Sequence, residues 1–232
     1  MNAVWTHWLA QILATDTPAL PHAWVMHIWL HLGWSVVLAC LGASIVGRWM
    51  PASAGKLDGR QWGVALALAL WTLVPGPVSP AYWLGLAFQA PSIPTVLVCD
   101  ALLRARFFAT RSGIPSKAIP HRATLAIALA GVLAGWALLL DTFAVLPMQL
   151  YAWGFSSAAV GTLLIVALVP WLVVSATHPT RSLRLWIVPV AVVVFAASRL
   201  PSGNVWDAVL DPWLWLALHV YVVRAVWRGL RR

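Results

Sequence analysis

Three histidines have the residue type and spacing best suited to binding a metal ion or a haem. His27 and His31 are four residues apart in an apolar stretch, which places them on one face of a helix. His219 lies in another apolar stretch near the end of the chain. An i, i+4 imidazole pair suits one metal ion such as copper, and imidazoles from two helices can ligate a b-type haem. We therefore predict His31, His219 and His27 as cofactor-binding residues, with His27 and His31 as the metal pair.

Two aspartates in apolar stretches are candidates for a proton or substrate site. Asp141 lies ~9 Å before Pro147 along a helix, and His31 and His219 lie at a similar depth in their own segments. Ionisable residues at such positions are costly and usually face a bundle interior, a cavity or a partner. Asp100 is followed four residues later by Arg104, so an ion pair is the competing interpretation there. For each histidine taken singly, a hydrogen bond to a backbone carbonyl or a position facing the lipid headgroups is the simpler interpretation.

The elements that carry these residues are predicted from composition. Hydrophobic residues make up 62% of the 232-residue chain and charged residues only 9%, which exceeds what a soluble core of this size can bury. A membrane span needs roughly 17 to 25 apolar residues, and continuous apolar runs without alternation indicate helices. We predict an all-α integral membrane protein with a bundle of about seven transmembrane helices.

The predicted organisation is an extracytoplasmic segment, 1–22, followed by a single transmembrane domain, 23–232. In the first segment, Ala3 to Ala14 has apolar residues at helical spacing and predicts a short helix in the outer interface, with a hydrophobic helix that faces a partner as the alternative. Prolines at 75, 77 and 80 separate the second span from the third, and Pro91 and Pro94 predict a kink or break within the third. The spans are predicted near 24–46, 62–78, 81–103, 123–146, 155–176, 185–197 and 212–227.

The distribution of basic residues predicts the orientation of this bundle. The seven-span assignment places fourteen of the fifteen Lys and Arg residues on one side, and only Arg199 on the other. Because Lys and Arg resist translocation, that side is cytoplasmic, the amino terminus is outside and the carboxyl terminus is inside. The chain is thus expected in the cell inner membrane as a multi-pass protein. Its net charge of +9 is explained by topology and anionic lipids, so no nucleic-acid partner is expected.

Several activities are disfavoured by what the sequence lacks. Both lysines, Lys56 and Lys117, fall in predicted loops, which excludes a Schiff-base lysine in the last helix. No nucleotide-binding, metalloprotease or serine-hydrolase motif occurs, so a stand-alone enzyme is not expected. Two function classes remain. The first is a redox-associated membrane subunit or assembly factor of a respiratory-type complex, with membrane lipids and other membrane subunits as partners. The second is a small carrier or permease component for a proton-coupled or small organic substrate.

Overall fold

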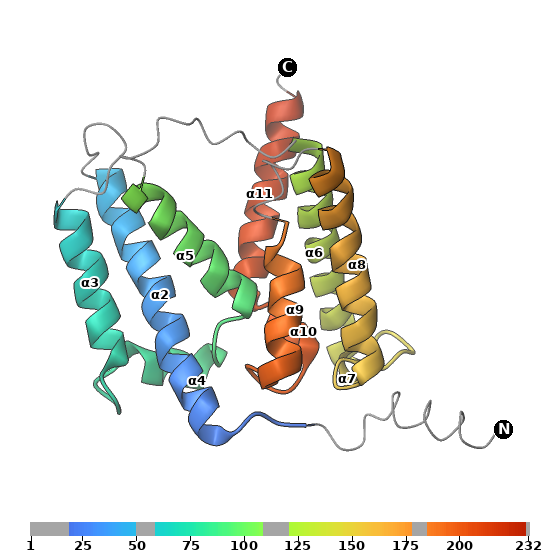
Figure 1. Cartoon of the computed structure of the whole chain (residues 1–232), viewed down its shortest axis with the longest axis horizontal. Helices are drawn as coiled ribbons and strands as arrows, with labels where there is room; N and C mark the ends of the chain where they lie inside the picture. The colour runs from blue at the N-terminus through green and yellow to red at the C-terminus, as the bar shows by residue number, and fades with distance from the viewer. Residues whose placement is uncertain (1–18, 50–58, 109–120, 178–184, 231–232) are drawn as a thin grey trace. The chain divides into compact units, whose positions relative to one another are not determined.

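The computed structural model describes residues 19–49, 59–108, 121–177 and 185–230 and is helical, with no strand in these ranges (Figure 1). The predicted interfacial helix, Ala3 to Ala14, lies outside the described residues. The chain divides into two compact units, His22–Ser116 and Lys117–Arg232 with the first 21 residues. Each unit is described by itself below. The helices and the absence of strands in the described ranges confirm the prediction of an all-α fold.

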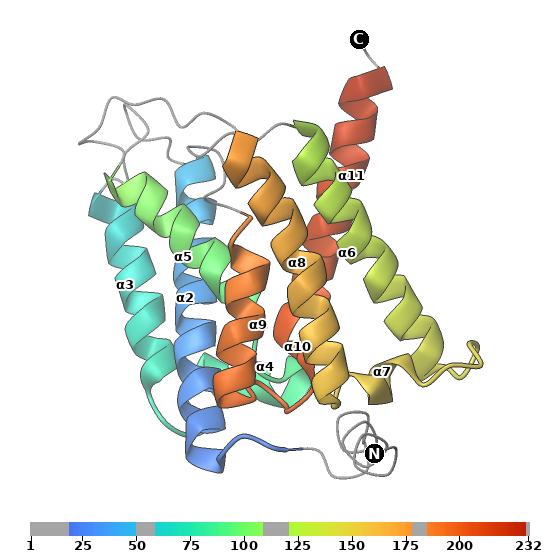
Figure 2. The ribbon, with the colours of Figure 1, turned by 45° about the vertical axis from the view of Figure 1, so that its right-hand side comes forward.

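In the unit His22–Ser116, the long helix α2 (Ala23–Trp49) is the element against which the others pack. Its neighbours are α3 (Gly59–Leu73), α4 (Pro80–Phe88) and α5 (Ile93–Phe108). Small residues allow close contact, because Ala39 and Ala43 of α2 form a buried cluster with Ala65 of α3. Helices α2, α3 and α5 run lengthwise, whereas α4 crosses the end at which α2 begins (Figures 1 and 2).

The predicted break in the third span is present and splits it into two helices. Ser79 caps α4 by accepting a hydrogen bond from the backbone N–H of Ala81, and Pro80 begins the helix. Gln89 ends α4 with a φ of 61°, in the left-handed region, and α5 begins at Ile93. The span predicted at 81–103 is thus a short helix followed by a longer one. The prolines explain the interruption, since each removes a backbone donor and restricts its predecessor.

In the residues that the structure describes, the second unit has four longer helices and two short ones. The longer ones are α6 (His121–Thr142), α8 (Ser157–Thr177), α9 (Ile187–Ser198) and α11 (Pro212–Leu230). The short helices α7 (Leu150–Trp153) and α10 (Val205–Val209) lie in the connections. Helix α6 packs on α11, where a Cβ added at Gly131 would meet Leu218 at 2.6 Å. This is the close approach that the GxxxG pattern of Gly131 and Gly135 permits.

Two described helices are long and apolar enough to cross a membrane by length and composition. They are Ala23–Trp49 and, within α6, Thr124–Thr142. Half of the first one's apolar window is buried within the protein, as in a soluble core helix, whereas only 6% of the second one's window is buried. The remaining described helices do not meet this criterion, so it does not establish seven spans.

Candidate functional site

His31 is held in a fixed orientation by the end of a neighbouring helix. Its side chain is buried on α2, and Nδ1 lies 2.8 Å from the carbonyl oxygen of Thr72 in the last turn of α3. A carbonyl only accepts, so Nδ1 carries the proton and donates. The lone pair of the neutral ring is then on Nε2. Ser79 donates to the same carbonyl at 2.8 Å, so this buried carbonyl in the last turn of α3 has two side-chain donors.

His27 lies one helical turn before His31 and contacts its ring. The ring centroids are 4.6 Å apart with an interplanar angle of 65°, and His27 is exposed. The spacing thus places both imidazoles on one face, as predicted. Two ring nitrogens bound to one ion are at most ~4 Å apart, a separation compatible with this ring contact. The described residues contain no group of three or more His, Cys, Asp or Glu that could hold a metal.

Two indoles of α2 donate hydrogen bonds to the backbone at the chain breaks around α4. Trp29 donates to the carbonyl of Pro91 at 3.0 Å, and Trp34 donates to the carbonyl of Gln89 at 2.9 Å. With His31, they give α2 three side-chain donors for backbone carbonyls that no helix satisfies. Irregular backbone is tolerated in an apolar setting only with such partners. Sequence reasoning placed Trp34 deep in its span but did not identify this role for either indole.

His219 has a partner on both ring nitrogens. Nδ1 lies 2.8 Å from the carbonyl oxygen of Trp215, one turn earlier in α11, and Nε2 accepts a hydrogen bond from the indole of Trp136 on α6 at 3.1 Å. The proton is therefore on Nδ1, since a carbonyl cannot donate and an indole N–H cannot accept. Ligation of a haem or metal by Nε2 requires Trp136 to be displaced. The interaction joins α6 to α11, and hence the predicted fourth and seventh spans.

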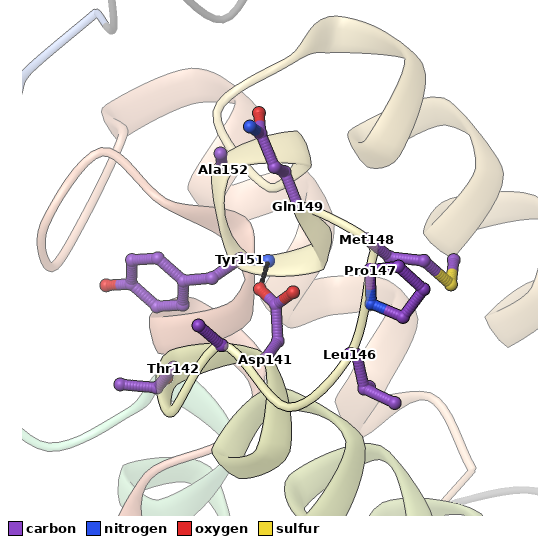
Figure 3. A pocket seen from close by; sticks show the side chains of 9 residues that line it. Asp141, Thr142, Leu146, Pro147, Met148, Gln149, Tyr151 and Ala152 are labelled. Carbon is purple, nitrogen blue, oxygen red and sulfur yellow. Dashed lines mark hydrogen bonds between the residues drawn. The ribbon is translucent and has the colours of Figure 1, made fainter.

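Asp141 lies in the last turn of α6 beside an open pocket of about 780 Å³. Its Oδ2 accepts a hydrogen bond of 2.7 Å from the backbone N–H of Tyr151 (Figure 3). Its Oδ1 is closed to solvent and has no hydrogen-bond partner among the described residues. Buried polar atoms without a partner are rare in native proteins and call for an explanation such as a bound ligand or water.

Tyr151 connects this carboxylate to a second one. Its hydroxyl donates to Oδ2 of Asp207 at 2.8 Å, and Ser202 donates to the same oxygen. Burial raises the pKa of Tyr151, and the charge and hydrogen bond of Asp207 raise it further, because the phenolate would be poorly solvated next to an anion. The segment is also held by Asn204, whose side chain donates to the carbonyl of Tyr151 at 2.9 Å.

No protein-family model, curated protein or solved structure matches the chain. Its function is therefore inferred from its own residues.

Asp100 forms the ion pair that its spacing predicts. Nε of Arg104 lies 2.8 Å from Oδ2 of Asp100, and the two side chains are 70% and 39% exposed, respectively. An ion pair this exposed contributes little to stability in water, with a typical value of ~0 to 1 kcal/mol. The geometry favours the structural interpretation of Asp100 over a role as a proton or substrate site.

The predicted site residues fall into two groups, one in each unit. His27 and His31 are adjacent on α2, whereas Asp141 and His219 lie on the packed pair α6 and α11. Each group has one atom that is the best candidate for contact with a ligand. In the first it is Nε2 of His31 beside the ring of His27, and in the second it is the unpartnered Oδ1 of Asp141. The hydrogen-bonded Nε2 of His219 is the least available of the predicted ligands.

Proposed function

We propose that this chain is a polytopic inner-membrane protein and a redox-associated subunit or assembly factor of a respiratory-type complex. Large apolar side chains that face outward within their own units support the membrane location. Leu133 on α6 is 67% exposed, and Ile165 on α8 and Val223 on α11 are exposed to 65% and 64%. They are among many large apolar side chains that are exposed in the described residues, and so much apolar surface is unfavourable in water and needs a cover. Lipid supplies that cover without any protein partner.

The proposed spans are α2, α3 and α5 in one unit and α6, α8, α9 and α11 in the other. In this assignment α5 replaces the span predicted at 81–103, because α4, with 9 residues, is only ~13 Å long and cannot cross ~30 Å of hydrocarbon. Helix α9, with 12 residues, is ~18 Å long and crosses only with its flanking turns or where the bilayer is thinner. The number of spans, and hence the cytoplasmic placement of the basic loops, is unchanged.

The proposed function is metal binding at His27 and His31, and one observation carries it. His31 donates through Nδ1 to the Thr72 carbonyl, the arrangement that metal-binding histidines almost always adopt because it fixes the tautomer and directs Nε2 at the ion. His27 is next to it on the same helix face. Imidazole suits copper, iron, zinc and nickel, and we propose copper because one i, i+4 pair supplies the two ligands of a low-coordinate ion.

A site with two protein ligands is suited to transfer rather than to permanent storage. Fewer ligands leave coordination positions open, so a receiving protein can bind the ion before the two imidazoles release it. The exposure of His27 provides access for such a partner. This supports an assembly factor over a resident redox subunit. A b-type haem on His219 and either His27 or His31 is the competing arrangement, and it requires the Trp136 hydrogen bond to be broken.

The test is copper binding by the protein purified in detergent. Cu(I) is titrated against the chromogenic chelator bicinchoninate, and one equivalent is expected to bind. His27→Ala and His31→Ala should each weaken the affinity by at least about tenfold, because the loss of even an outer-shell partner of a metal ligand costs that much. His219→Ala is the control and should bind copper like the unaltered protein. Equal affinity in all four proteins contradicts the proposal. A Soret band that disappears in His31→Ala and His219→Ala supports haem instead.

A second candidate function, a small carrier or permease component, is favoured by the unpartnered Oδ1 of Asp141 in its pocket. A carboxylate with one oxygen free of a donor is the kind of group that exchanges a proton or a cationic substrate during transport. Proteoliposomes provide the test, since a carrier should dissipate an imposed pH gradient when substrate is added and Asp141→Asn should not. Equal proton flux in both proteins contradicts this role.

A further inference from the structure

The pocket beside Asp141 has the composition of a binding site for a small cation with an apolar body. It is lined by nine residues from the end of α6 to α7, of which Asp141 is the only charged one. Apolar lining is contributed by Ala144, Leu146, Pro147, Met148 and Ala152. Small-molecule sites commonly combine a mostly apolar wall with a few polar groups and have volumes of ~300 to 1,000 Å³. The volume of about 780 Å³ is within this range.

Asp141 has an unmet requirement for a hydrogen-bond donor at this site. The backbone N–H of Tyr151 satisfies Oδ2, but Oδ1 is shielded from water and no described residue donates to it. Figure 3 shows the carboxylate between the end of α6 and the backbone of α7. A shielded carboxylate oxygen without a donor raises the free energy of the ligand-free protein. A ligand that brings a donor and a positive charge removes this penalty.

We propose that this pocket binds the ammonium group of a small primary amine, with Oδ1 of Asp141 as its acceptor and the apolar wall around its hydrocarbon part. The proposal deepens the carrier function and is independent of the histidine pair on α2. A hard metal cation fits less well, because Ca²⁺ takes six to eight oxygen ligands and Mg²⁺ about six, whereas the lining provides one carboxylate. An ammonium group needs fewer acceptors and forms strong charge-assisted hydrogen bonds.

A small side-chain rotation is enough to expose the acceptor. The terminal torsion of aspartate has broad, roughly two-fold wells, so its carboxylate turns easily about the Cβ–Cγ bond. Asp141 already lines the pocket, and its Oδ2 accepts from the Tyr151 N–H; we expect a rotation to turn one oxygen toward the ligand while the other keeps the Tyr151 N–H. The amine is thus expected to bind with a local change confined to Asp141 and its immediate neighbours.

A second carboxylate strengthens the attraction for a cation. The hydroxyl of Tyr151 is bonded to Asp207, so the residue that holds Asp141 through its backbone holds another anion through its side chain. No Lys, Arg or His is present among the nine lining residues. Two nearby carboxylates without a lining base create a negative potential that concentrates cations. The site therefore discriminates against anionic ligands.

The ammonium group has two chemical sources, a soluble amine and the headgroup of phosphatidylethanolamine. The probe for binding is n-butylammonium chloride, titrated calorimetrically into the full-length protein in nanodiscs of phosphatidylcholine. n-Butanol is the neutral probe of similar shape. It should bind at least about tenfold more weakly than the amine, because it lacks the charge that Asp141 pairs with. Equal binding of the amine and the alcohol overturns the proposal.

Matched variants connect the binding to Asp141. Asp141→Asn removes the charge but keeps an acceptor for Tyr151, and it should weaken butylammonium binding by about tenfold. Asp100→Asn is the same change at a carboxylate that already has Arg104 as its partner, and binding should change less than about twofold. Ala152→Phe fills the pocket and should weaken binding even if Asp141→Asn does not fold. Unchanged affinity in Asp141→Asn or in Ala152→Phe overturns the proposal.

Nanodiscs that contain phosphatidylethanolamine distinguish the two sources. If this lipid weakens butylammonium binding to the unaltered protein by competition, the natural ligand is the lipid headgroup. If binding is the same in both lipids, the site selects a soluble amine. Loss of amine binding with intact copper binding at His31 shows that the two sites are separate. Loss of the pH-gradient response alone contradicts the carrier function but leaves the binding site in place.

Discussion

The indole N–H of Trp136 donates to Nε2 of His219 across 3.1 Å, although the two residues are 83 positions apart in the chain. The imidazole in turn donates to the carbonyl of Trp215. Trp136 and Trp215 are also in edge-to-face contact, with ring centroids 5.3 Å apart. The three side chains join α6 to α11 at the level of the GxxxG pattern. His219 therefore acts as a structural link in this state.

This link predicts coupled effects on stability. Trp136→Phe and His219→Phe each leave one polar partner unpaired and should lower the free energy of unfolding by about 0.5 to 1.5 kcal/mol, because the bond is partly exposed. The loss of unfolding free energy in the double variant should be smaller than the sum of the two single losses, by at least about 0.5 kcal/mol. Thermal unfolding in detergent provides the measurement. Trp24→Phe, at a side chain that is 66% exposed, is the control and should change little. Strict additivity contradicts the link.

Helix positions followed from the sequence more completely than side-chain partners did. The span predicted at 24–46 is the helix Ala23–Trp49, and that at 155–176 is Ser157–Thr177. Apolar runs and prolines define these limits locally. The split of 81–103 followed from its prolines only as a kink or break, and not as the nine-residue helix Pro80–Phe88. The apolar stretch 81–103 is continuous in sequence, so it does not indicate that α4 crosses the end of α2 whereas α5 packs along α2.

Partners distant in sequence were not predictable. The bond from His31 to Thr72 joins residues 41 positions apart, and it exists because α3 ends where α2 passes. The hydrophobic periodicity of α2 and α3 does not predict this contact. The i, i+4 contacts, in contrast, were predicted, since helix geometry alone places His27 beside His31 and Asp100 beside Arg104. The unpartnered oxygen of Asp141 depends on how α7 folds back on α6, which sequence reasoning did not identify.

The seven-span topology predicts the activity of reporter fusions. Alkaline phosphatase is active only outside the cytoplasm, so fusions after Asp16, between Pro75 and Pro80, near Met148 and near Gly203 should be active. Fusions after Lys56, Lys117 and Arg184 should be inactive, because basic loops are retained inside. Expression of every fusion is checked by immunoblot. An active fusion at Lys117 contradicts the assignment of α3 and α5 as separate spans.

Gly154 is predicted to be intolerant of even one added methyl group. It follows α7, and a Cβ there would collide with the side chains of Asn204 and Trp206. Asn204 is fully buried and cannot move without losing its bond to Tyr151. Gly154→Ala should therefore lower the free energy of unfolding by about 1 to 3 kcal/mol through overpacking. The readout is the thermal unfolding midpoint.

Gly161 provides the matched control for this substitution. It lies in α8, and a Cβ there would meet nothing within 4 Å. Gly161→Ala should be neutral or should raise stability by about 0.5 to 1 kcal/mol, because alanine favours the helix. Equal midpoints for Gly154→Ala and the unaltered protein contradict the packing of α7 against α10.

The raised pKa of Tyr151 predicts a loss of stability in alkaline solution. The folded state holds the phenolic proton more tightly than the unfolded chain, in which the pKa is ~10. This contribution is present below pH ~10 and is lost as the pH rises toward the folded pKa, because the unfolded state then releases the proton first. The unfolding midpoint should therefore fall more steeply above pH ~10 in the unaltered protein than in Tyr151→Phe. Asp207→Asn should reduce the slope less than Tyr151→Phe does, because it removes the neighbouring charge but leaves burial, the larger cause of the raised pKa of Tyr151. Tyr82→Phe, at an exposed tyrosine, is the control. Identical slopes in the unaltered protein and Tyr151→Phe contradict the buried contact between Tyr151 and Asp207.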